Sequence, residues 1–149
     1  MCSSDLALFF FSRFGEAREH FSRALEFQPA DARRLLWLYL ARARAGQDGK
    51  RELAAGAKGL DLAEWPGPIV KLFLDAATAS SVLESAQSEE AEEDLDRHCE
   101  AYFYLGQYAL LQGNRDDAID FFENALETGL TGHSDYEAAE AELARLGRR

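Results

Sequence analysis

The chain has 149 residues, of which 47% are hydrophobic and 11% aromatic, and this apolar content favours one folded domain over disorder. Its formal net charge of −11 is concentrated in residues 61–149, with six basic and twenty acidic side chains, so this half would repel nucleic acid and anionic membranes. Only two cysteines occur, and no apolar run approaches the roughly 20 residues that span a bilayer. The simplest interpretation of the acidic surplus is solubility.

The same sequence pattern occurs once near each end of the chain. Residues 17–25 and 118–126 both read Ala-x3-Phe-x2-Ala-Leu, at an offset of 101 residues. Three repeats of about 34 residues would give about 102. One such segment would also suit an ordinary amphipathic helix, but two copies at this offset favour a helical repeat. Because residues 1–6 do not read as the start of a helix, residues 1–31 are predicted to be a truncated first repeat.

The second unit is predicted over residues 32–64. Ala32–Gly46 has apolar residues at helical spacing, Gly46–Gly49 reads as a turn, and Lys50–Leu60 gives a second helix. Small residues replace the large residue expected in this second helix. The unit is therefore predicted to be a looser copy of the repeat.

The third unit, residues 65–98, is predicted to be an irregular helical hairpin. Two prolines in Trp65–Pro68 suit the first turn of a helix whose apolar body is Ile69–Ala76. Ser81–Glu84 reads as a capping box for a short second helix. The acidic segment Ser88–Asp96 is expected to begin the next long helix.

The fourth unit, residues 99–132, is the most regular. Small and large apolar residues recur on one face of Cys99–Gly113, Gly113 suits the left-handed end of this helix, and Asn114 suits the cap of the next. Ser134–Glu137 then reads as a capping box that opens a closing helix over residues 134–147. A closing helix would cover the last apolar face of a solenoid.

This unit resembles the tetratricopeptide repeat (TPR) signature over 34 residues. The matching positions are Tyr102, Leu105, Gly106, Ala109, Gly113, Ala118, Phe122, Ala125 and Leu126. The resemblance implies an all-α fold, a TPR-type α-α superhelix that forms a right-handed solenoid of antiparallel helix pairs with a C-terminal capping helix. Residues 1–149 would form a single TPR-like domain.

Longer segments are similar to a narrower group of bacterial TPR proteins, those related to the outer-membrane lipoprotein NlpI. They are Trp37–Leu40, Trp65–Leu74 and Cys99–Tyr108, together with Tyr136–Ala139. This resemblance implies a periplasmic, outer-membrane-associated scaffold that brings a protease together with cell-wall hydrolases. The chain shows neither a signal peptide nor a lipobox, so a cytoplasmic location stays open.

No catalytic, cofactor-binding or metal-binding residues are predicted. His20, His98 and His133 are far apart in the sequence. His98 and Cys99 are adjacent, but neighbouring residues on a helix point about 100° apart, which is a poor geometry for a shared ligand. The chain is therefore predicted not to be an enzyme and to need no cofactor.

A partner protein is predicted to bind in the concave groove, which the first helix of each repeat lines in TPR solenoids. The side chains expected to face it are Arg33, Leu36, Leu40, Arg44, Glu100, Phe103, Gln107, Leu110 and Leu111. Packing against neighbouring helices is an equal alternative for the Leu and Phe residues. Nucleic acid and direct membrane insertion are not expected, and a homodimer is left open. The alternative function is a structural, oligomerising or capping segment of a longer TPR protein.

Overall fold

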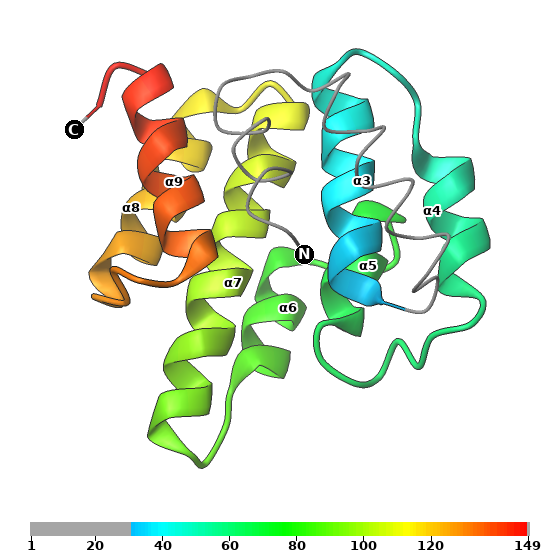
Figure 1. Cartoon of the computed structure of the whole chain (residues 1–149), viewed down its shortest axis with the longest axis horizontal. Coiled ribbons are helices and arrows are strands. Elements are labelled where there is room, and N and C mark those ends of the chain that lie inside the picture. Colours follow the sequence, from blue (N-terminus) through cyan, green and yellow to red (C-terminus); the bar gives the residue numbers. More distant parts are fainter. Residues whose placement is uncertain (1–30, 149) are drawn as a thin grey trace. The chain divides into compact units, whose positions relative to one another are not determined.

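The computed structural model describes residues 31–148, and every regular element in that range is an α-helix (Figure 1). The predicted all-α class is therefore confirmed for these residues. The chain divides into two compact units, one ending at Ala77 and the other beginning at Thr78. The predicted first repeat and its Ala-x3-Phe segment fall in residues 1–30, outside the described residues. The helices are α3 (Ala32–Arg44), α4 (Lys50–Ala57), α5 (Gly67–Phe73), α6 (Ala79–Ala86), α7 (Ala91–Leu111), α8 (Arg115–Glu127) and α9 (Ser134–Arg145).

In the first unit, α3 packs against α4 and α5. The Asp31 side chain caps α3 by accepting hydrogen bonds from the backbone amides of Arg33 (3.0 Å) and Arg34 (3.3 Å). The ring of Tyr39 on α3 lies 5.1 Å from that of Phe73 on α5. All three helices end two or three residues before the predicted positions, and α5 is followed by a left-handed residue, Asp75, with φ of 60°.

Helix α4 approaches α3 closely because Gly56 has no side chain. A Cβ atom built on Gly56 would lie 3.0 Å from Cδ1 of Leu35. The small residues that made this helix untypical in sequence therefore allow close helix packing.

The second unit contains the TPR pair, with α7 packed against α6, α8 and α9 (Figure 1). Helix α7 begins at Ala91, so the acidic segment does form its first turns, as predicted. Gly113 is left-handed, with φ of 78°, and Asn114 caps α8 by accepting from the backbone amide of Asp117 (3.3 Å). A Cβ atom on Gly106 would lie 2.6 Å from Cδ1 of Phe122, so the mid-helix glycine allows α7 and α8 to meet at the Phe122 ring.

Two predicted helix caps in this unit were wrong, although α9 does begin at Ser134. The capping box of α6 begins at Thr78, which accepts from the Ser81 amide (3.1 Å), while Ser81 Oγ accepts from the Thr78 amide (3.0 Å). The cap of α9 is His133, whose ring accepts from the Asp135 amide (3.2 Å). In both cases Ser-x-x-Glu fits the capping pattern locally, but an upstream side chain reaches the exposed backbone amides instead.

Candidate protein-binding surface

Helix α3 carries four of the residues predicted to face a partner. Arg33 is exposed and Arg44 is half-buried, whereas Leu36 and Leu40 are fully buried. The fully buried leucines belong to the core, so the exposed surface of this set comes from the two arginines.

Helix α7 carries the other five predicted residues. Glu100, Phe103 and Gln107 are buried, and Leu110 and Leu111 near the end of the helix are half-buried. The cause is that three neighbouring helices pack against α7, which leaves no broad free face along its middle.

The burial of Leu36, Leu40 and Phe103 favours the packing alternative for these side chains. Of the predicted residues, Arg33, Arg44, Leu110 and Leu111 keep surface that a partner could reach. The structure describes the two sets on separate units, and their joint role in one groove stays a prediction.

Gln107 was predicted to face a partner, but its buried side chain bonds to another helix instead. Its side-chain amide donates to Oε2 of Glu142 on α9 at 2.7 Å, and both side chains are buried. Glu142 also pairs with Arg145 one turn later on α9. A buried carboxylate needs such partners, so this contact fixes the position of α9 against α7. The contact between Gln107 and Glu142 could not be predicted from the sequence, because the two residues are far apart along the chain.

The neighbouring side chains of His98 and Cys99 lie in different surroundings. The His98 ring faces back along its own helix, with Nδ1 2.7 Å from the carbonyl oxygen of Asp94. Cys99 is fully buried, and burial raises the pKa of its thiol to about 11, with a hydrogen bond to Thr128 partly opposing this shift. A thiol with this pKa is a poor nucleophile at neutral pH because the thiolate is scarce.

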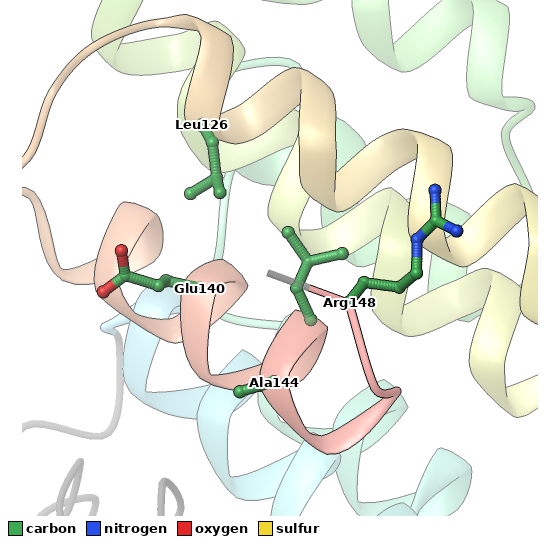
Figure 2. A pocket seen from close by; sticks show the side chains of 5 residues that line it. Leu126, Glu140, Ala144 and Arg148 are labelled. Carbon is green, nitrogen blue, oxygen red and sulfur yellow. The ribbon is translucent and has the colours of Figure 1, made fainter.

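The described residues contain a pocket that the sequence analysis missed. It lies on the second unit and is lined by Leu126 of α8, by Glu140, Leu143 and Ala144 of α9, and by Arg148. Its volume is about 350 Å³, and Glu140 and Arg148 lie at its opposite ends (Figure 2). We call it the terminal pocket.

Residues 31–148 contain no cluster of three or more His, Cys, Asp or Glu side chains that could hold a metal ion. In the same range no helix has both the length and the apolar character needed to cross a membrane.

Comparison with known proteins identifies one repeat within this geometry. The tetratricopeptide repeat model matches residues 99–128, which contain the glycine-mediated contact between α7 and α8. Residues 99–128 therefore match a tetratricopeptide repeat. The chain is also 27% identical, over 144 residues and 95% of its length, to the lipoprotein NlpI homolog of Haemophilus influenzae.

The aligned region covers 46% of the Haemophilus influenzae protein, so the chain spans about half the length of this relative. No solved structure matches the chain. The repeat match indicates a helical-repeat fold of the kind that engages other proteins.

Proposed function

We propose that this TPR protein is a non-catalytic adaptor that binds proteases or cell-wall hydrolases of the bacterial cell envelope. The observation that carries the proposal is the α7–α8 pair, in which Gly106 admits the ring of Phe122 as a TPR requires. The similarity to the NlpI homolog supports the cell-envelope context.

We propose one partner-binding patch on each unit, formed by the predicted residues that keep exposed area. They are Arg33 and Arg44 of α3 on the first unit, and Leu110 and Leu111 of α7 on the second. Arginine is enriched at interaction hot spots, and the two leucines offer apolar contact area.

The test is affinity capture from a bacterial cell-envelope extract, followed by mass spectrometry. Wild-type chain should recover a protease or a cell-wall hydrolase. Arg33→Glu and Leu111→Glu should reduce the recovery at least about tenfold, as expected for hot-spot residues. Recovery of cytosolic proteins alone would refute the envelope role.

Matched control variants distinguish the loss of a partner contact from a non-specific effect of the substitution. Arg51→Glu makes the same charge change at an exposed position of α4, and Leu95→Glu makes the same polar change on α7, where Leu95 is 42% exposed. Both controls should bind as wild type. Equal losses in test and control variants would mean that the proposed surface is wrong.

A further inference from the structure

The terminal pocket is the feature of the second unit that the proposed surface does not include. Leu126, Leu143 and Ala144 give it an apolar lining, and none of them belongs to the predicted partner-binding set. Its volume of about 350 Å³ falls at the lower end of the range for ligand pockets, about 300–1,000 Å³. That size suits one large side chain of a partner better than a whole helix.

The pocket exists because α9 covers the end of the TPR pair incompletely. Ala138, Ala139 and Leu143 of α9 are buried, whereas Ala144 is exposed and Leu126 of α8 is half-buried. The helix predicted to cap the repeat therefore leaves part of the apolar face accessible.

Acidic side chains near the terminal pocket favour a positively charged ligand. Glu137 and Glu140 are exposed and lie one turn apart on α9, and Glu123 lies one turn before Leu126 on α8. The positive charge of Arg148 is offset by Glu123, at 3.5 Å. Residues 78–149 carry seventeen acidic and five basic side chains, a formal balance of −12, so the field around the pocket attracts cations.

We propose that the terminal pocket binds a basic peptide segment of a partner protein, which inserts one large apolar side chain beside Leu126. The apolar side chain gains burial against Leu126, Leu143 and Ala144, and flanking lysine or arginine side chains pair with Glu137 and Glu140. This inference deepens the proposed adaptor function and rests on it, but it uses different residues.

The test uses the full chain and a short fluorescent peptide that carries one leucine between two pairs of lysines. Fluorescence anisotropy at low salt should show saturable binding, and the backbone NMR signals of Leu126 and Ala144 should shift. Leu126→Glu and Glu140→Lys should each weaken binding at least about tenfold. Replacing the peptide leucine by serine, or its lysines by glutamates, should have the same effect.

The controls make the same substitutions elsewhere in the second unit. Leu95→Glu on α7 and Glu84→Lys on α6 change exposed residues outside the pocket, and α6 packs against α7. Glu140→Lys keeps the test valid if Leu126→Glu impairs folding, since Glu140 is exposed; far-UV circular dichroism monitors the fold.

Three results would overturn the inference. One is the absence of binding to the leucine peptide, and another is equal binding of the serine peptide. The third is self-association of the chain in light scattering that Leu126→Glu abolishes, because a second copy would then occupy the pocket. If envelope partners are still captured through Arg33 and Leu111 while the peptide fails to bind, only the pocket inference fails.

Discussion

Replacing Gly106 by alanine tests whether close packing of α7 and α8 defines the repeat. An added Cβ atom would lie 2.6 Å from Cδ1 and 2.8 Å from Cζ of Phe122. The Phe122 ring cannot move aside easily, because it is fully buried and its centroid lies 6.1 Å from that of Phe103. The helices must therefore separate or the ring must leave its preferred rotamer.

The expected magnitude is the difference between two opposing effects. Overpacking a core costs about 1–3 kcal/mol, and the upper end applies because a buried aromatic ring is displaced. Removing a mid-helix glycine contributes about 1 kcal/mol in the other direction. Gly106→Ala should therefore lower the free energy of unfolding by about 2 kcal/mol, which corresponds to a fall of about 4–8 °C in Tm for a chain of this size.

Urea unfolding followed by circular dichroism measures this change. Ala54→Gly, at an exposed position of α4, calibrates the propensity effect and should cost about 1 kcal/mol. In a double-mutant cycle, Phe122→Leu should recover at least about 1 kcal/mol of the loss caused by Gly106→Ala. A Gly106→Ala chain as stable as wild type, or more stable, would refute the packing argument.

Three further predictions concern the second unit. Glu142→Ala should cost about 2 kcal/mol in urea unfolding because it leaves the buried amide of Gln107 without its acceptor, whereas Glu142→Gln should cost less. The thiol of Cys99 has a pKa of about 11, so roughly a thousandth of it is thiolate at pH 8. In a Cys2→Ser variant, a thiol reagent should therefore modify Cys99 at least about a hundredfold more slowly in the folded chain than in urea. Equal rates would contradict the burial of Cys99. Thr78→Ala should cost about 1 kcal/mol and speed hydrogen exchange of the capped amide at the third position of α6, and unchanged exchange would show that the capping box is dispensable.

The sequence alone determined the helical architecture of the described residues. Helix periodicity does not depend on distant residues, and neither do the left-handed Gly113 and the Asn114 cap, so local chemistry sufficed for α7 and α8. The capping residues Thr78 and His133 were missed because several nearby polar residues can cap a helix, and only the folded backbone decides which one reaches its amides.

Only the tertiary structure decided which side chains remain available to a partner. Leu36, Phe103 and Gln107 have the spacing of a free helix face, but a spacing does not reveal how many neighbours a helix has. The contact between Gln107 and Glu142 and the pocket beside Leu126 both join residues of different helices. Such features depend on how the faces of separate helices meet, which periodicity within one helix does not specify.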